Sequence, residues 1–165
     1  MAKTITTSVG GLADGGVRSA LGKLQGAVVD QLLNTAGLTL GSSSKPKLKI
    51  ANTIYALVTG VLVKKTTAEI VISGTVTNAK FNVFVLTIDN AGTVTATMGT
   101  EGATIGAVLF PTIPTNQAVI GFAIVNPTGT GNFIGGTTDL DDATVVPNAV
   151  YVNTVGTFNP NCLAL

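Results

Sequence analysis

The fold of this chain is decided by residues 81–98, which read FNVFVLTIDNAGTVTATM. A run rich in Val, Phe, Leu and Ile at 81–88 leads into Asp89-Asn90-Ala91-Gly92. Asp, Asn and Gly tolerate the backbone angles of a tight turn, and residues 93–98 then alternate Thr with apolar side chains. This pattern predicts an antiparallel β-hairpin.

Short runs rich in β-branched residues continue on both sides of this hairpin. Polar, Pro-rich or Gly-rich segments separate them, and no helical pattern interrupts them after residue 45. Strands connected in this way form antiparallel sheets, since parallel strands need crossover connections. We therefore expect a mainly β fold, an antiparallel β-sandwich or barrel of jelly-roll-like type. The expected strands lie within residues 48–63, 69–76, 107–110, 118–125 and 149–155.

The N-terminal part of the chain has a different pattern, which is typical of a helix. Large apolar residues recur there at spacings of three and four, so they would form a stripe along one side of a helix. Asp14 suits the N-terminal cap and Gly37 the left-handed C-terminal cap, which predicts a helix over about residues 15–36. The stripe consists of Val17, Leu21, Leu24, Val28 and Leu32.

This change of pattern predicts two parts. Residues 1–45 are expected to form an N-terminal arm that contains the amphipathic helix and ends in the Gly/Ser-rich linker 41–46. Residues 46–165 are expected to form the β-domain. The apolar stripe must pack on something, and two interpretations stay open: it covers the β-domain of its own chain, or it reaches a neighbouring subunit.

The chain carries unusually few charges. Of its 165 residues 10% are charged and 45% are hydrophobic, whereas about 25% of an ordinary soluble domain is charged. We favour the interpretation that other protein subunits cover much of this surface. The alternative is a Thr-rich β-protein whose hydroxyl groups keep it soluble. A net charge of +1 is too small to attract a nucleic acid.

The sequence also gives expectations about membranes and location. Its longest apolar stretch, residues 50–63, is too short and too often interrupted by polar residues to cross a membrane. The first residues lack the continuous apolar segment of a secretory signal, so we expect synthesis in the cytoplasm. Cys162 is the only cysteine, which excludes a disulfide within the chain.

The residue types that most catalytic sites need are missing. The chain contains no histidine, which excludes Ser-His and Cys-His nucleophile pairs and imidazole-bound zinc. A single cysteine cannot form a thiolate cage, and the two glutamates, Glu69 and Glu101, are far apart in the sequence. We therefore expect neither enzymatic activity nor a cofactor.

Two loop segments contain residues that could bind ions. Asp139, Asp141 and Asp142 would offer carboxylates to a cation such as calcium, but they lack the EF-hand spacing. We prefer the interpretation that Asp139 caps a short helical turn over residues 141–144. The Gly-rich segment 129–135 lacks the spacing of a phosphate-binding loop, and we expect its Phe133 to enter the core.

Three lysines at alternate positions form a candidate interaction patch. In a strand, the side chains of Lys45, Lys47 and Lys49 would share one face. Such a patch would either dock an acidic partner or protect an edge strand from unwanted pairing. Both interpretations stay open.

Part of the sequence resembles proteins of tailed-bacteriophage virions. The resemblance covers roughly residues 48–155 and rests on segments in a shared order. These are ANTIY at 51–55, PTIP at 111–114, AVIGFAIVN at 118–126, NFIGGTTDLD at 132–141 and YVNT at 151–154. The resemblance implies a head decoration (cement) or head-fibre protein. Such a protein would be β-rich, trimeric and attached to the outside of an icosahedral shell, with the major capsid protein as its partner.

We therefore expect a virion structural protein that bridges major capsid subunits on the capsid surface. The candidate contact residues are the apolar stripe and the three lysines. The alternative is a tail or head-fibre module for host-surface attachment. Such modules often anchor on Tyr and Trp side chains, and this chain has only two Tyr and no Trp. A shell-forming subunit is a third candidate, which the short chain disfavours.

Overall fold

A computed structural model describes Gly16, Ser19 and residues 30–160. Residues 30–160 form a mainly β domain in which every strand pair is antiparallel, as the sequence predicted. The strands before residue 80 are β1 (Gln31–Leu32), β2 (Leu38–Leu40), β3 (Lys47–Ile50), β4 (Ile54–Val58), β5 (Val61–Lys65), β6 (Ala68–Val71) and β7 (Thr75–Val76). After it come β8 (Asn82–Asp89), β9 (Val94–Met98), the 3-10 helix η1 (Ile105–Ala107), β10 (Gln117–Val125), β11 (Phe133–Ile134) and β12 (Val150–Asn153).

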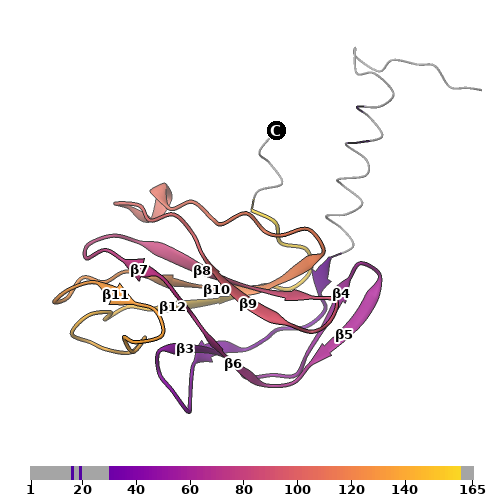
Figure 1. Cartoon of the computed structure of the whole chain (residues 1–165), viewed down its shortest axis with the longest axis horizontal. Helices are drawn as coiled ribbons and strands as arrows, with labels where there is room; N and C mark the ends of the chain where they lie inside the picture. Colours follow the sequence, from indigo (N-terminus) through magenta and orange to yellow (C-terminus); the bar gives the residue numbers. More distant parts are fainter. Residues whose placement is uncertain (1–15, 17–18, 20–29, 161–165) are drawn as a thin grey trace, which may run out of the picture.

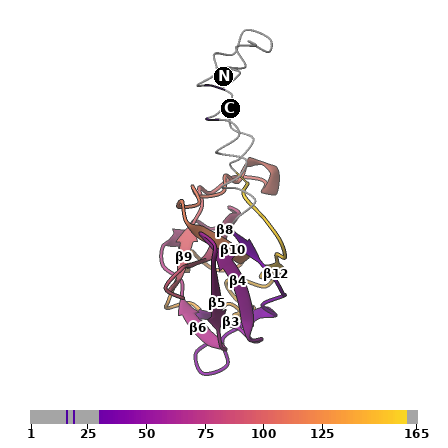
Figure 2. The same cartoon turned by 90° about the vertical axis from the view of Figure 1, so that its right-hand side faces the viewer.

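The strands form a sandwich of two layers. One layer is a four-stranded sheet in the order β12-β10-β8-β9, and the other contains the three-stranded sheets β1-β4-β5 and β2-β3-β6. Figure 1 shows β3 and β6 below the β8–β10 pair, with the β4–β5 hairpin at one end of the domain and β7 and β11 toward the other. The same layers appear from the side in Figure 2.

The main hydrophobic core lies between the two layers because one side of each strand is apolar. Strand β8 contributes Phe84, Leu86 and Ile88, all fully buried, and β3 contributes Leu48 and Ile50 from the opposite layer. Phe133 is also fully buried, and its ring meets that of Phe84 edge-on at 5.9 Å between centroids. The prediction that Phe133 enters the core is therefore confirmed.

A second, smaller core covers the outer side of the four-stranded sheet. Val85 of β8 lies in it, so this central strand is buried on both faces. The covering groups come from the loop 99–116 and from the C-terminal segment. Phe110 and Phe158 pack on Phe122 of β10, with ring centroids 5.1 and 5.7 Å from that of Phe122. The chain thus covers this layer with its own loops.

The hairpin that the sequence predicted at 81–98 is confirmed. Strands β8 and β9 pair in register from Phe84–Met98 to Ile88–Val94. The Asp89 carboxylate holds the turn, since its Oδ1 accepts hydrogen bonds from the N–H groups of Ala91 at 2.9 Å and Thr93 at 2.8 Å. Local side-chain chemistry therefore accounts for this turn.

The predicted helix over 15–36 is wrong in its last turns. Gln31 and Leu32 form β1, because their backbone groups pair with β4 and with Gly156. Gly37 has the expected left-handed conformation, with φ of 58°, but it leads into β2 and ends no helix. Residues 1–29, apart from Gly16 and Ser19, lie outside the described part, so the rest of this helix stays a prediction.

Two further boundaries differ from the predictions. The β-domain includes residues 30–45, and the predicted linker 41–46 is the turn of the β2–β3 hairpin, where the Gly41 N–H donates to the Lys47 carbonyl at 2.8 Å. Residues 107–110 form the end of η1 and a loop in which Leu109 makes a bridge with Thr100, not a strand. Val108 and Phe110 of this segment cover the four-stranded sheet.

Candidate functional site

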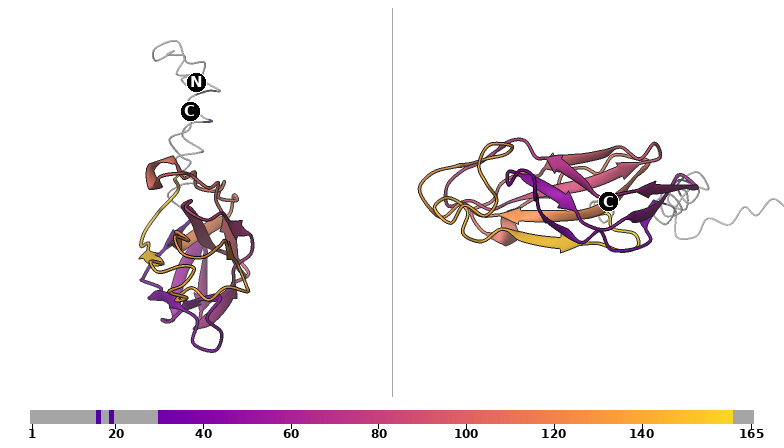
Figure 3. Two further views of the ribbon diagram at one scale, coloured as in Figure 1. Left: turned by 90° about the vertical axis from the view of Figure 1, so that its left-hand side faces the viewer. Right: turned by 90° about the horizontal axis from the view of Figure 1, so that it is seen from below.

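The outer face of the β1–β4–β5 sheet exposes an apolar surface to solvent. Along β4, Ile54, Ala56 and Val58 point into the core, so the side chains between them point outward. Figures 1 and 3 place the β4–β5 hairpin at one end of the elongated domain. We call this surface the apolar face, and its members are Leu33, Tyr55, Leu57 and Leu62.

The strand register arranges the outer face in two cross-strand rows. Side chains opposite each other in such rows lie close enough to form one continuous surface. The N–H of Leu33 donates to the carbonyl of Tyr55 at 2.9 Å, which continues the β1–β4 ladder by one residue. The rows are Gln31–Leu57–Leu62 and Leu33–Tyr55–Lys64.

The apolar face is open to solvent over much of its area. Leu62 is 64% exposed, Leu33 is 47% exposed and Tyr55 is 40% exposed. A single exposed apolar side chain is ordinary, whereas a large contiguous apolar patch is unusual on the surface of a monomer. Lys64 supplies the charge at the margin of these rows.

Side chains on either side of β1 fix the geometry of the apolar face by hydrogen bonds. Thr59 and Gly60, with φ of 51° and 80°, make the tight turn between β4 and β5. The Asp30 carboxylate accepts a hydrogen bond from the Thr59 N–H at 2.7 Å. Asn34 accepts one from the Tyr55 N–H at 2.8 Å. The chain therefore enters the sheet beside the β4–β5 turn and continues as β1, the strand next to β4.

One residue of the predicted apolar stripe belongs to the core. Leu32 is fully buried, and its backbone exchanges two hydrogen bonds with Gly156, at 3.2 and 2.7 Å. Leu32 is therefore not a contact residue, and that prediction is wrong. The other four members, Val17, Leu21, Leu24 and Val28, lie outside the described residues, and their role stays a prediction.

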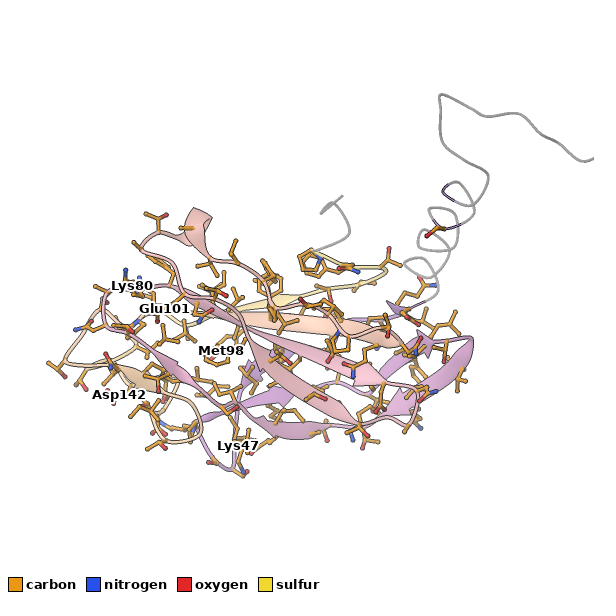
Figure 4. The ribbon with its side chains drawn as sticks, turned by 45° about the horizontal axis from the view of Figure 1, so that its top comes forward. Lys47, Lys80, Met98, Glu101 and Asp142 are labelled. Atoms are coloured by element: carbon orange, nitrogen blue, oxygen red, sulfur yellow. The ribbon has the colours of Figure 1, made fainter. Side chains whose placement is uncertain are left out.

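The outer face of the β2–β3–β6 sheet is polar by contrast. Lys47 and Lys49 share this face as predicted, because they alternate with the buried Leu48 and Ile50. Strand β3 is the central strand of its sheet, so these lysines do not protect an edge and that interpretation is wrong. Lys47 lies at the margin of the domain in Figure 4. We call this surface the polar face, and its members are Thr39, Lys47, Lys49, Glu69 and Val71.

The Glu69 carboxylate of the polar face is held by the β2–β3 turn. Its Oε1 accepts hydrogen bonds from the N–H groups of Ser42 and Ser43, both at 2.8 Å, and from the Ser42 hydroxyl at 3.0 Å. The Ser43 hydroxyl donates to Oε2. Chiefly through the Ser43 hydroxyl and N–H, these donors lower the pKa of Glu69 to about 2. Lys49 adds a 2.7 Å hydrogen bond to the Ser42 hydroxyl.

Lys45 is separated from the other two lysines. It lies in the β2–β3 turn, and its Nζ forms an ion pair with Asp141 at 2.8 Å. The hydrogen bond and the charge of Asp141 raise the pKa of Lys45. The three lysines therefore do not form one patch, and the acidic group that Lys45 meets belongs to its own chain.

The acidic run 139–142 organises its own loop. Asp142 Oδ1 accepts hydrogen bonds from the Thr144 N–H at 2.8 Å and from its hydroxyl at 2.6 Å, which lower the pKa of Asp142. The side chain that accepts these hydrogen bonds is thus Asp142 and not Asp139 as predicted, and residues 141–144 form no helix. Within the described residues, no cluster of His, Cys, Asp and Glu side chains could hold a metal ion.

The second glutamate also binds a loop of its own chain. Glu101 accepts hydrogen bonds from the N–H and the hydroxyl of Thr77, both at 2.9 Å. These bonds, aided by the charge of Lys80, lower the pKa of Glu101. Figure 4 shows Lys80 and Glu101 on the same part of the domain. Both glutamates thus fix backbone segments in place.

Large apolar side chains are also exposed on other parts of the domain. Two of them, Ile105 and Leu109, lie on the loop that covers the four-stranded sheet, in the layer opposite the apolar face. Others belong to β6, β11, β12 and the segment after β12. These are Val71, Ile134, Val150 and Val155.

Comparison of the chain with protein-family models, with curated proteins and with solved structures found no match. Among the described residues, no helix has the length and apolar character needed to cross a membrane.

Sequence reasoning missed the apolar face, although a signal for it is present. The apolar run 50–63 contains the Thr59-Gly60 pair, and this pair is the signal for a hairpin turn. Placing the turn there pairs β4, which is apolar on both sides, with the apolar first half of β5. One side must face the core, so the other side is left for an exposed apolar surface.

Proposed function

We propose that this chain is a virion structural protein that binds the outside of an icosahedral capsid. In this proposal it is made in the host cytoplasm and stabilises the shell by bridging major capsid subunits, as a decoration or cement protein does. The observation that carries the proposal is a surface with few charges and many exposed large apolar side chains. Such a surface favours contact with other protein.

The energetics of this surface favour burial between neighbours. Removing apolar area from water contributes about 25 cal/mol per Å². Burying an unpaired charge would oppose association, and only 10% of the chain is charged. The described carboxylates of Glu69, Glu101 and Asp142 are already bound by hydroxyl and N–H groups of their own chain. This arrangement supports a binding role and gives these carboxylates a structural task.

The distribution of the apolar side chains supports bridging. The apolar face lies on one layer of the sandwich, whereas Leu109 lies on the loop that covers the other layer. A copy with contact groups on both layers is able to touch two neighbours at once. A protein that binds only the assembled shell stabilises that shell in proportion to its occupancy, because disassembly must also break the added contacts.

Self-association into a trimer would strengthen such binding. Once one subunit of a trimer is bound, the other two are held near their own sites at high effective concentration. Each contact is then sufficient even when it is weak, because the trimer as a whole stays bound.

The test is deletion of the encoding gene followed by electron microscopy and mass spectrometry of purified particles. We expect density for this domain on the outer surface of wild-type capsids, loss of that density in the deletion, and DNA release from the deletion particles at a lower temperature. Complementation with the wild-type gene should restore both. Density on the tail would instead identify a host-attachment module, and particles without the protein would contradict the proposal.

A further inference from the structure

We infer that residues 155–160 form a strap that closes one edge of the β1–β4–β5 sheet and opens while the rest of the sandwich stays folded. The strap contacts two parts of the domain at once, the side of β1 that faces away from β4 and the aromatic rings on the outer side of β10. This device is a property of the domain itself, so it goes beyond the proposed function and does not depend on capsid binding.

Thr154 is the point at which the strap leaves the sandwich. The register between β8 and β10 shifts between Val119 and Gly121, so Ile120 has no paired residue in β8. The carbonyl of Val119 accepts a hydrogen bond from the Thr154 hydroxyl at 2.9 Å, and that of Ile120 accepts one from the Thr154 N–H at 3.4 Å. Thr154 is buried, whereas Val155 directly after it is 60% exposed. The irregularity in β10 therefore holds the chain at Thr154, where the strap begins.

The strap is held mainly by Gly156 and Phe158. Gly156 exchanges two backbone hydrogen bonds with Leu32 of β1, at 2.7 and 3.2 Å, and its φ of 83° is one that glycine adopts without strain. The Phe158 ring stacks on that of Phe122, with 5.7 Å between centroids. The residues on either side of Phe158 are exposed. A segment with so much of its surface in water belongs to the part of a domain that opens most readily.

Strand β1 is held more firmly on its other side, where it meets β4. The N–H of Leu33 donates to the carbonyl of Tyr55 at 2.9 Å. The Asp30 carboxylate accepts a hydrogen bond from the Thr59 N–H at 2.7 Å. The Asn34 amide oxygen accepts one from the Tyr55 N–H at 2.8 Å. We therefore expect the opening to occur between β1 and the strap, and not between β1 and β4.

Opening of the strap would uncover a pairing edge and an aromatic surface. The N–H and the carbonyl of Leu32 are bonded to Gly156, so both lose their partner when the strap leaves. The same step exposes Phe110 and Phe122, whose rings contact that of Phe158. In the closed state the strap thus protects an edge strand in the way that a covering loop does.

Native-state hydrogen exchange of the full chain, followed by NMR, tests the inference with two neighbouring amides. The Leu32 N–H is bonded to the strap, whereas the Leu33 N–H is bonded to β4. After correction for intrinsic rates, the Leu32 and Gly156 amides should exchange on the order of tenfold faster than the Leu33 amide. Low concentrations of urea should leave this faster exchange nearly unchanged, because opening the strap exposes little surface.

The same measurement is able to overturn the inference. If Leu32 and Leu33 have equal protection and the same dependence on urea, the strap opens only together with β1, and the inference is wrong.

Variants of the strap give a second test. G156P lacks the N–H that bonds to Leu32 and cannot adopt a φ of 83°, and F158A removes the stacked ring. Both should keep the far-UV circular dichroism of the wild type. Both should also raise the fluorescence of the dye ANS several-fold, because ANS reports exposed apolar surface. V155A, at an exposed position of the strap, is the matched control and should behave as the wild type.

Two results with these variants contradict the inference. Loss of the β signal in G156P and F158A would show that the segment is required for the sandwich itself. Unchanged ANS fluorescence in both would show that the segment covers no apolar surface.

Discussion

The two three-stranded sheets of the same layer differ on their outer sides. Both bury alternate apolar side chains, such as Ala56 in one and Leu48 in the other, in a common core. On the solvent side, the β2–β3–β6 sheet presents Lys47, Lys49 and Glu69, whereas the β1–β4–β5 sheet presents the apolar face. Two three-stranded sheets that share a core thus present different surfaces to solvent.

The difference shows on which outer face the side chains find partners within their own chain. On the polar face, Glu69 is satisfied by the turn of its own chain and Lys49 by a serine hydroxyl. On the apolar face the backbone is satisfied, but Leu33 and Leu62 meet no comparable group among residues 30–160. A polar surface is stable in water, whereas an apolar one gains free energy when another molecule covers it.

The largest expected effect comes from Leu32 of β1, compared with Leu33 directly after this strand. L32A should lower the free energy of unfolding by about 2–5 kcal/mol, because it leaves a cavity in the core. L33A, one residue away and exposed, should change it by no more than about 0.5 kcal/mol. Urea unfolding at low protein concentration measures both. Equal effects would show that β1 does not have this inward and outward alternation.

Added salt distinguishes an apolar contact between copies from an ionic one. Sodium sulfate should strengthen association of copies several-fold, because excluded salts favour the burial of apolar surface. Ionic contacts would be screened and weakened by added salt. Sedimentation equilibrium at increasing sulfate or sodium chloride provides the measurement. Association that falls steeply with sodium chloride would contradict an apolar interface.

Acid should abolish the contribution of the polar face. Folding lowers the pKa of Glu69 from an ordinary 4.5 to about 2, so its contribution is full above about pH 4.5 and is lost as the pH falls toward 2. The difference in melting temperature between the wild type and E69Q should shrink over that range.

Titration of the Glu69 carboxyl by NMR measures the shift directly. S43A should raise the pKa of Glu69 toward its ordinary value, because the Ser43 hydroxyl is the largest cause of the shift. A Glu69 pKa near 4.5 in the wild type would show that the serine turn does not bind the carboxylate.

The smallest effect is expected for the exposed ion pair between Lys45 and Asp141. Because solvent screens both groups, K45M and D141N should each change the melting temperature little, and their coupling in a double-mutant cycle should approach zero at high salt. K47M is the matched control on the polar face. A large, salt-independent coupling would show that the pair is much better shielded than its exposed position indicates.

The sequence was most informative where short-range chemistry decides the structure. Asp89 and Gly92 in the turn between two strand-like runs predicted the β8–β9 hairpin, and the apolar Phe133 in a Gly-rich loop was predicted to enter the core. The low charge was also visible directly and led to the expectation of an interaction surface.

The sequence was misleading where contacts between residues far apart in the chain decide the structure. Leu32 stands at a helical spacing from Val28, yet it forms a strand because β4 and Gly156 offer backbone partners that no local pattern reveals. The lysines at 45, 47 and 49 alternate as in one strand, but the chain turns at Lys45 and pairs it with Asp141, far away in sequence.

The sequence by itself determined that the chain forms antiparallel strands joined by polar turns and that few charges are available for its surface. Only the tertiary structure decided which apolar sides are covered. Strands β8 and β4 both carry apolar residues on their two faces, and alternation fixes only that successive side chains point to opposite sides. The loop 99–116 covers the second face of β8, whereas Tyr55 and Leu57 of β4 remain on the surface. Such covering depends on contacts between segments that are distant in the sequence.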